Sequence, residues 1–359
     1  MFNIKRFKLA KQIRRLTGKS LAEKAGLTPV TISKIENGHA PEKETIERLV
    51  KALGFPKSFF VMDDPELLDS EAVSFRSLSK MNAKERDASL AAGGLGIELY
   101  NWINDKFNLP EVDLIDLNKE RNRPETAARM LRQHWQLGDR PIGNMLKLLE
   151  SKGIRILSLS ESTKNVDAYS FWHSNSAYIF LNQEKTAERS IFDSAHELAH
   201  LVLHHHAGAK NDRGAEMQAD RFASAFLMPE ADIRSNVRHN VITATEVIKL
   251  KFRWRVSAMA LAYRLHALEL LSDWRYRSLC IELGQRGYRS GEPKGVKRET
   301  SVVLEKVFRA LWLKQFTKED LTEELSFPLN DLENLIFKLS VVNEVSQSEE
   351  AVEGLRLVN

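Results

Sequence analysis

The sequence predicts a mainly α-helical chain that carries one small β-sheet, an α+β fold. Apolar residues recur at helical spacing through most of the 359 residues, whereas residues 154–159 and 167–183 have the β-branched, aromatic and apolar character of strands. Pairs of predicted helices precede and follow these strands, an order typical of α+β domains. The chain is 43% hydrophobic and 28% charged, which excludes a disordered protein, and its length predicts more than one domain.

The N-terminal part, residues 1–61, is predicted to be an all-α helix-turn-helix domain. Residues 4–16 have the spacing of a basic amphipathic helix, and residues 18–38 have the spacing of two short helices joined by a turn. Thr28 precedes a proline, and this pair is typical of the N-cap and first position of a helix. Residues 42–53 are predicted to complete the domain as a further helix.

The charge of this domain predicts that it binds double-stranded DNA. Residues 1–60 carry 13 Lys and Arg against 5 Asp and Glu, a net charge of +8, whereas the rest of the chain has a net charge of −4. If the domain docks conventionally, the second motif helix enters the major groove. Its exposed side would then consist of Thr28, Val30, Thr31 and Lys34. The alternative is a basic helical bundle that binds protein.

Residues 62–119 are predicted to connect this domain to the next one. The acidic stretch at 62–71 is expected to be a linker. A helical stretch follows it, and three glycines are expected to interrupt that stretch: Gly93, Gly94 and Gly96.

An α+β domain is predicted at residues 120–240, and a helical C-terminal region at 241–359. The chain has a single cysteine and no apolar run of 18 residues, so we expect a cytoplasmic protein without a disulfide framework. Residues 316–337 also have the pattern of a helix-turn-helix, but residues 317–334 hold one lysine against six acids. This charge is wrong for a DNA phosphate surface, so a homodimer or partner contact is expected there.

Five of the ten histidines lie within residues 194–206. On a helix, His196 and His200 would lie on one face with Glu197 beside them, opposite an apolar face. This His-Glu-x-x-His spacing predicts a metal site, and the alternative is a solvated helix face. His204, His205 and His206 are expected to form a solvated end of the same helix, with His204 as the reserve candidate for a further polar role.

A second helix, predicted at residues 213–228, supplies a carboxylate to the same site. Glu216 and Asp220 lie four residues apart on it, and a short glycine-containing loop would bring it back antiparallel to the histidine helix. Two imidazoles and one carboxylate make the three-ligand arrangement of catalytic zinc, so His196, His200 and Glu216 are the predicted Zn²⁺ ligands. Asp220 is expected to accept the free N–H of a ligating histidine. The alternative is a surface acidic pair.

Glu197 is predicted to be the catalytic base rather than a ligand. A carboxylate between the two histidines would point at water and could take its proton once zinc has lowered the pKa of that water to about 7. The reaction class is metal-assisted hydrolysis, most simply of a peptide bond. The candidates for stabilising the oxyanion are Tyr178, Tyr263 and His239. Residues 176–182 are expected to form either a core strand or a sheet edge that pairs with an extended substrate.

These motifs carry a family resemblance. The stretch "AHELAHLVLHH" followed by "AEMQADRFASAFLMP" resembles the ImmA/IrrE family of zincin-like metallopeptidases, and "LAEKAGLTPVTISKIENG" resembles the XRE-type helix-turn-helix of phage repressors. The resemblance implies that His196, His200 and Glu216 hold zinc and that Glu197 is the general base. It also implies a protein substrate, which in this family is often a repressor, for example one encoded nearby.

The helix-turn-helix departs from many XRE domains at two positions. Those domains have glutamine at the start of each motif helix, whereas this chain has Gly18 and Pro29. Because these residues cannot read base edges as an amide does, we expect modest sequence specificity.

Two functions are compatible with the sequence. The first is a DNA-binding transcriptional regulator with a zinc-dependent endopeptidase domain that cleaves a repressor or regulatory partner, with activity that depends on a signal. The second is a regulator whose zinc domain is a ligand or stress sensor without proteolysis. The presence of Glu197 favours the first function, because a sensor does not need a general base.

Overall fold

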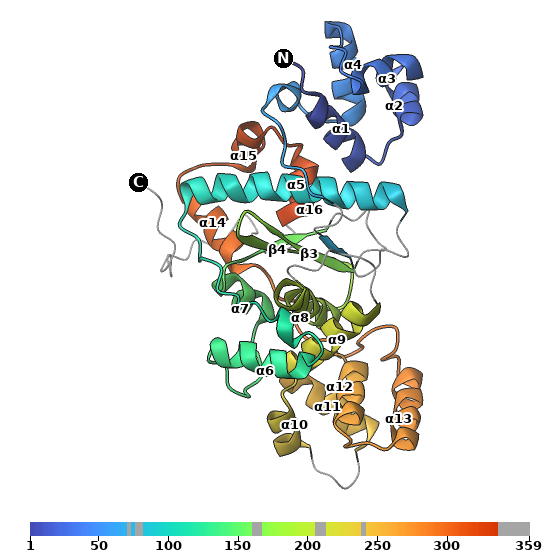
Figure 1. Ribbon diagram of the computed structural model, residues 1–359, viewed down its shortest axis with the longest axis vertical. Helices are drawn as coiled ribbons and strands as arrows, with labels where there is room; N and C mark the ends of the chain where they lie inside the picture. The colour runs from blue at the N-terminus through green and yellow to red at the C-terminus, as the bar shows by residue number, and fades with distance from the viewer. Residues whose placement is uncertain (70–72, 76–81, 160–166, 205–212, 238–241, 337–359) are drawn as a thin grey trace.

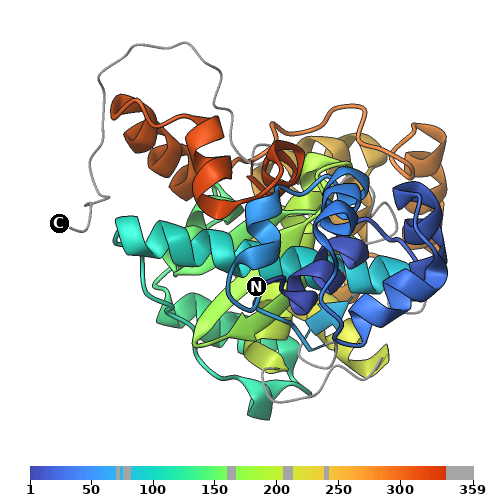
Figure 2. The ribbon, with the colours of Figure 1, turned by 90° about the horizontal axis from the view of Figure 1, so that it is seen from above.

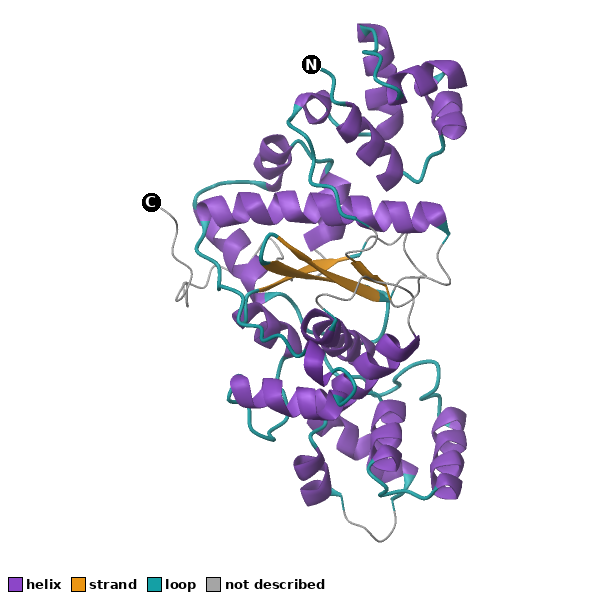
Figure 3. Ribbon diagram, in the orientation of Figure 1, coloured by secondary structure: helices purple, strands orange, loops and turns teal. Residues whose placement is uncertain are grey.

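The computed structural model is built in layers (Figure 1). It describes residues 1–69, 73–75, 82–159, 167–204, 213–237 and 242–336. From one end of the molecule to the other, an N-terminal helical domain, a long helix, a small sheet and several helical layers follow each other (Figure 3). The expected fold class, mainly α with one small sheet, is therefore confirmed. No helix within the described ranges is long and apolar enough to cross a bilayer.

The N-terminal domain is all-α. Its helices are α1 (Ile4–Ile13), α2 (Gly18–Ala25), α3 (Pro29–Glu36) and α4 (Lys43–Leu53), followed by the short 3₁₀ helix η1 (Lys57–Val61). The Thr28 side chain caps α3 by accepting the Thr31 N–H at 3.1 Å. Gly26 turns the chain between α2 and α3 with φ of 65°, a conformation that favours glycine. Buried apolar side chains from all four helices form the core, among them Phe7, Leu21, Ile32 and Leu49.

The sheet has four strands in the order β1-β3-β4-β2. The strands are β1 (Val73–Phe75), β2 (Ile154–Ser158), β3 (Ala168–His173) and β4 (Ser176–Leu181). β3 and β4 form the predicted hairpin, whereas β2 pairs with β4 in parallel. The expectation that residues 176–182 could be a sheet edge is wrong, because β4 lies between β3 and β2. The sequence also did not predict β1, which is only three residues long and pairs antiparallel with β3.

The two faces of the sheet are covered by different helices (Figure 1). The long helix α5 (Ala83–Lys106) lies on one face, and α8 (Ala187–Leu203) lies on the other. Tyr169 stacks on Phe180 on the α5 face, and its hydroxyl donates to the Ser89 carbonyl of α5 at 2.8 Å. Trp172 points to the other face, where its Nε1–H donates to the Leu201 carbonyl of α8 at 3.1 Å. This alternation along β3 is the normal pleat of a strand.

The three glycines of α5 do not interrupt the helix, contrary to expectation. They instead allow other parts of the chain to approach it closely, because a Cβ atom at Gly94 would lie 2.3 Å from the Glu66 carbonyl oxygen. A Cβ atom at Gly93 would lie 2.3 Å from Leu68 Cδ1, and one at Gly96 would meet side chains of the sheet. Residues 62–69, which were expected to be a linker, therefore pack along this helix.

The N-terminal domain holds the start of this segment. The Arg6 Nε–H donates to the Asp63 carbonyl at 2.7 Å, and the Arg6 Nη1 atom lies 3.0 Å from Glu98 Oε2 on α5. Lys5 forms an ion pair with Asp64. The described start of the connection, residues 62–69, is thus packed between the N-terminal domain and α5.

Further helices surround the sheet and α8. The helices α6 (Pro124–His134), α7 (Met145–Ser151) and α9 (Arg213–Leu227) belong to the layer around α8, with the 3₁₀ helix η3 (Asn118–Glu120). The helices α10 (Glu230–Asn236), α11 (Ala244–Trp254), α12 (Ala258–Ala267) and α13 (Asp273–Gln285) form the end opposite the N-terminal domain. The chain then returns through α14 (Val302–Leu313), α15 (Lys318–Leu325) and α16 (Leu329–Ile336).

The acidic helices α15 and α16 pack against their own chain. Figure 2 shows them beside the N-terminal domain. Both Nη atoms of Arg14 donate to the Asp331 carboxylate, at 2.8 and 2.6 Å. The Trp102 Nε1–H of α5 donates to Glu324 Oε2 at 2.6 Å. The partner of this acidic segment in the structure is therefore the chain's own N-terminal domain and α5, which the sequence did not indicate.

Candidate metal centre

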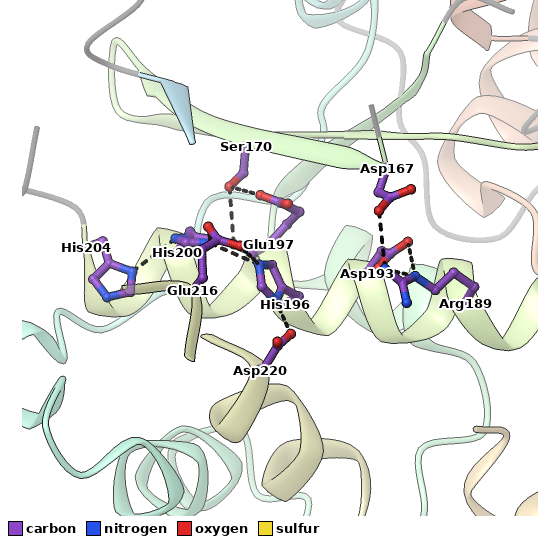
Figure 4. Close-up of polar contacts among 10 residues, drawn as sticks. All are labelled: Asp167, Ser170, Arg189, Asp193, His196, Glu197, His200, His204, Glu216 and Asp220. Carbon is purple, nitrogen blue, oxygen red and sulfur yellow. Dashed lines mark hydrogen bonds and ion pairs between the residues drawn. The ribbon is translucent and has the colours of Figure 1, made fainter. Parts of the chain in front are cut away.

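Two neighbouring helices, α8 and α9, supply the side chains of the candidate metal centre (Figure 4). The Thr186 side chain caps α8 by accepting the Arg189 N–H at 3.2 Å. The sheet covers one side of α8 and other helices cover the rest, so its histidine face is as buried as its apolar face. α9 lies alongside α8 and directs Glu216 and Asp220 toward the two histidines.

Three predicted ligand residues converge in the structure. The Nε2 atoms of His196 and His200 lie 3.1 Å apart, and they lie 3.4 and 3.3 Å from the two carboxylate oxygens of Glu216. One ligand atom from each residue falls within 4.8 Å of the others. The histidines are almost completely buried, whereas the Glu216 side chain is 35% exposed.

Asp220 fixes the protonation of the first histidine. The His196 Nδ1–H donates to Asp220 Oδ1 at 2.8 Å, because a carboxylate can only accept. A neutral imidazole that carries its proton on Nδ1 has a lone pair on Nε2. The lone pair of His196 is therefore directed at His200 and Glu216.

A chain of hydrogen bonds fixes the second histidine in the same way. The His204 Nε2–H donates to Gln218 Oε1 at 2.9 Å, so His204 Nδ1 is an acceptor. The Gln218 amide in turn donates to Asn122 Oδ1 at 3.2 Å. His204 Nδ1 then accepts the His200 Nδ1–H at 3.1 Å, which leaves a lone pair on His200 Nε2 as well.

This arrangement fits a metal ion. Two imidazole lone pairs and one carboxylate face each other in a buried site, and three acceptors at such distances repel one another unless a cation lies among them. Two nitrogens and one carboxylate oxygen form the donor set of catalytic zinc sites. The histidine and carboxylate residues present thus suit Zn²⁺.

The protonation states support the same conclusion. Burial lowers the pKa of His200 to about 4, which keeps the imidazole neutral. Burial acts to raise the pKa of Glu216, but its contacts with His196 and His200 outweigh burial and hold this pKa well below its usual range. A neutral imidazole and an ionised carboxylate are the forms that bind metals.

Glu197 points away from Glu216, toward the sheet. It is fully buried, and its Oε2 atom accepts the Ser170 Oγ–H of β3 at 2.7 Å. Its Oε1 atom is buried and has no hydrogen-bond partner among the described residues. Burial raises the pKa of Glu197 to about 7, although the neighbouring His196 and the Ser170 hydroxyl lower it. A carboxyl group with this pKa can both take up and release a proton at neutral pH.

A second ionic group anchors α8 one turn before the histidines (Figure 4). The Arg189 Nη2 atom lies 3.2 Å from Asp167 Oδ2, at the start of β3, and its Nε atom lies 3.1 Å from Asp193 Oδ1. The contact ties the first half of α8 to the same strand that carries Ser170. It therefore fixes the position of Glu197 relative to β3.

The structure describes two of the three candidates for an oxyanion stabiliser, Tyr178 and Tyr263. Tyr178 pairs with Phe171 across the hairpin and packs against Tyr100 of α5, so it lies on the sheet face opposite α8. The Tyr178 candidate is therefore wrong, because the pleat directs it away. Tyr263 lies on α12, which packs against α9, and its side chain is 48% exposed. His239 lies outside the described residues.

The predicted DNA contacts lie on one helix. Thr28 caps α3, Val30 is 63% exposed and Lys34 is exposed, whereas Ile32 and Ile35 are buried. Figure 1 places α3 on the side of the N-terminal domain that faces away from α5. Thr31 is half-buried, and its hydroxyl lies 2.9 Å from that of Thr28. The exposed side of the second motif helix thus carries Val30 and Lys34.

Two residues of the site were missed in the sequence. Ser170 contacts Glu197, and the signal for it was a polar residue in a buried strand otherwise made of aromatic and apolar side chains. Gln218 orients His204, and no sequence signal identifies it, because its direction depends on how α9 packs against α8.

Comparisons with known protein families agree with this organisation. The model of the helix-turn-helix family matches residues 10–60, and the model of the peptidase M78 family, described as the IrrE N-terminal-like domain, matches residues 149–266. The second match contains β2 to β4, the candidate metal centre and the helices up to α12. A comparison with curated proteins found no match. The chain therefore joins an XRE-type helix-turn-helix domain to a metallopeptidase-like domain of the IrrE type, as the resemblance predicted.

Proposed function

We propose that the protein is a DNA-binding transcriptional regulator whose M78 domain is a zinc-dependent endopeptidase acting on a cytoplasmic protein. The observation that carries this proposal is the position of Glu197. A fully buried carboxyl group lies directly beside a converging His-His-Glu set and has one oxygen free of hydrogen bonds within the described chain. A site that only stored or sensed zinc would not need this group.

His196, His200 and Glu216 would hold the zinc ion, with Asp220 and His204 fixing the two histidine rings. When bound, zinc acts as a Lewis acid that polarises the substrate carbonyl and makes water a better nucleophile at neutral pH.

Glu197 moves the protons of the reaction. Its free Oε1 atom takes a proton from the attacking water and then delivers it to the amide nitrogen of the leaving peptide. Ser170 holds the other carboxylate oxygen, so the side chain keeps one orientation through both steps. Burial raises the pKa of Glu197 toward neutrality, which suits a group that alternates between base and acid.

The substrate is a protein that presents an extended segment, such as a repressor or a regulatory partner. The β3 edge nearest to Glu197 is the edge of the sheet that pairs with β1, where Ser74 lies opposite Ser170. An extended peptide that paired with β3 would run past the same point. In this structure the chain's own connecting segment occupies that edge, so a protein substrate has to displace β1 before it can bind. This requirement makes the activity conditional.

The pairing of β1 with the edge of β3 also favours the chain itself as a second substrate. Cleavage near β1 would separate the DNA-binding domain from the peptidase domain, because β1 lies on the connection between them.

The DNA-binding domain would use Thr28, Val30, Thr31 and Lys34 of α3 to contact duplex DNA.

The test compares wild type with Glu197→Gln, which keeps the size and hydrogen bonding of the side chain but cannot act as a base. We expect Glu197→Gln to retain close to one zinc per chain, while cleavage falls by about 10²–10⁴-fold. His196→Ala and Glu216→Ala should lose the zinc, as measured by elemental analysis. Full zinc occupancy in both of these variants would contradict the ligand assignment.

Cleavage is followed in cells, where the abundance of co-encoded repressors and of the full-length chain is measured under stress. A chelator should abolish cleavage by the purified wild type, and added zinc should restore it. If wild type and Glu197→Gln give the same cleavage and transcription, the protein is a regulator whose zinc domain serves as a sensor.

A further inference from the structure

A cavity of about 660 Å³ lies where the DNA-binding domain meets the rest of the molecule. One side consists of the ends of α1, α2 and α4, and the other side consists of α5 and α16. This volume is in the range of small-molecule sites. The cavity is separate from the candidate metal centre, since none of its lining residues belongs to α8 or α9.

The polar part of the cavity is strongly positive. Arg14, Arg15, Lys24 and Lys51 line it, and Asp331 is the one acid among its lining residues. Asp331 already forms the two-pronged ion pair with Arg14. Of the other three cations, Arg15 is attracted by Glu85 near the start of α5, whereas Lys24 and Lys51 are exposed and form no ion pair within the described residues.

Arg15 gives the clearest sign that a group is missing. Its Nε and Nη2 atoms are buried, and neither has a hydrogen-bond partner in the described residues. Buried donors of a charged group are expensive to leave unpaired, and native proteins satisfy nearly all of them. An anionic oxygen in the cavity would satisfy both atoms.

The remaining lining is apolar. Ala88, Ala92 and Leu95 of α5 form one wall, and Leu159 and Leu335 lie beside them. A ligand that only carried charge would leave this surface uncovered. The combination of unpaired cations and an apolar wall suits a molecule with an anionic group at one end and an apolar body at the other.

We propose that this cavity binds a small organic anion with an apolar body, through Arg15, Lys24 and Lys51. Because the cations come from the DNA-binding domain and the wall comes from α5, the ligand would contact both parts at once. A ligand that binds only when both sides are in place shifts the population toward the docked arrangement. The site would thus report a metabolite to the DNA-binding domain independently of the metal centre.

The probe for the test is 1-naphthyl phosphate, which carries a phosphate dianion on an aromatic body. Binding to the full-length protein is measured by calorimetry. We expect one site per chain, with an affinity about tenfold or more above that of inorganic phosphate or of 1-naphthol. Raising the salt concentration should weaken naphthyl phosphate binding and leave naphthol binding unchanged. Equal affinities for the three probes, or no binding, would overturn the proposal.

The variants locate the site. The double variant Arg15→Gln/Lys51→Gln should lose about tenfold or more in affinity for naphthyl phosphate. The control is Lys43→Gln/Lys57→Gln, which removes two exposed lysines of the same domain outside the cavity. This control should bind the probe like wild type. If the double variant fails to fold, Arg15→Lys is measured instead. This variant keeps the charge and should retain part of the affinity for naphthyl phosphate. His196→Ala should bind the probe normally. Loss of binding in His196→Ala, or equal losses in both double variants, would show that the probe binds elsewhere.

Discussion

The Nδ1 atom of His204 lies 3.1 Å from the Nδ1 atom of His200, so a histidine outside the predicted ligand set orients a predicted ligand. Gln218 fixes the proton of His204, and through it the lone pair of His200 that faces Glu216. The third histidine of the row therefore belongs to the candidate metal centre, although it is outside the His196-His200-Glu216 group.

His204→Ala should weaken zinc binding by about 10–100-fold, because His200 then loses the acceptor that fixes its ring. The affinity is measured by competition with a chromophoric chelator. His39→Ala removes an exposed histidine of the DNA-binding domain and is the control. An unchanged affinity in His204→Ala would mean that His200 does not depend on this hydrogen bond.

The stability of the protein should depend on pH through Glu150. This carboxyl group, on α7, accepts the Val302 N–H at 2.8 Å and caps α14, and burial raises its pKa from 4.5 to about 7. Since the folded pKa lies above the unfolded one, the contribution of Glu150 to stability is full below about pH 4.5 and is lost as the pH rises to about 7. The loss amounts to about 3 kcal/mol over this window.

Glu150→Gln cannot ionise, so its free energy of unfolding relative to wild type should rise by about this amount between the two pH values. Urea denaturation at a series of pH values measures the difference. The exposed Glu23→Gln is the control, and its difference from wild type should stay constant. A constant difference for Glu150→Gln would show that its carboxyl group titrates normally.

DNA binding should depend on Lys34, which is exposed on α3. Lys34→Ala should weaken binding of the full-length protein to its own promoter and reduce the slope of log K against log salt by about 1, as expected for one lost phosphate contact. Lys147→Ala removes an exposed lysine of α7 and should leave both quantities unchanged. Binding that does not respond to salt would favour a protein-binding role for the domain.

The parts of the site that lie within one helix could be predicted from the sequence. His196 and His200 are four residues apart, so helical geometry alone puts them on one face, and the same applies to Glu216 and Asp220. The fold class was predictable for a similar reason, since helical and strand periodicities are local. Even there, the pleat of β4 turned Tyr178 away from the site, which the sequence did not reveal.

The contacts that could not be predicted join distant parts of the chain. Ser170 and Glu197 are 27 residues apart, and which polar residue of β3 faces α8 depends on the register of the hairpin. Gly93 and Gly94 looked like helix breakers, because the sequence does not show that another segment lies against them. A glycine can serve either purpose, and only tertiary packing decides which.

Gly94→Ala should loosen the connecting segment. The new Cβ atom would lie 2.3 Å from the Glu66 carbonyl oxygen, so this segment has to move off α5, although alanine favours the helix itself by roughly 0.5–1 kcal/mol. We expect faster cleavage after Glu66 by an endoproteinase specific for glutamate. Gly143→Ala, whose Cβ atom would have no neighbour within 4 Å, is the control. Equal cleavage rates would show that the segment does not rest on Gly94.

The ion pair between Arg14 and Asp331 joins residues that are 317 positions apart. On a ribosome, the DNA-binding domain emerges before α16 and can fold from its own short-range contacts. It cannot dock through Arg14 until α16 has been translated. A chain that stopped before α16 would therefore keep the Arg6 contacts to Asp63 and Glu98 but lack the Arg14–Asp331 ion pair, so the second attachment of the DNA-binding domain depends on translation of α16.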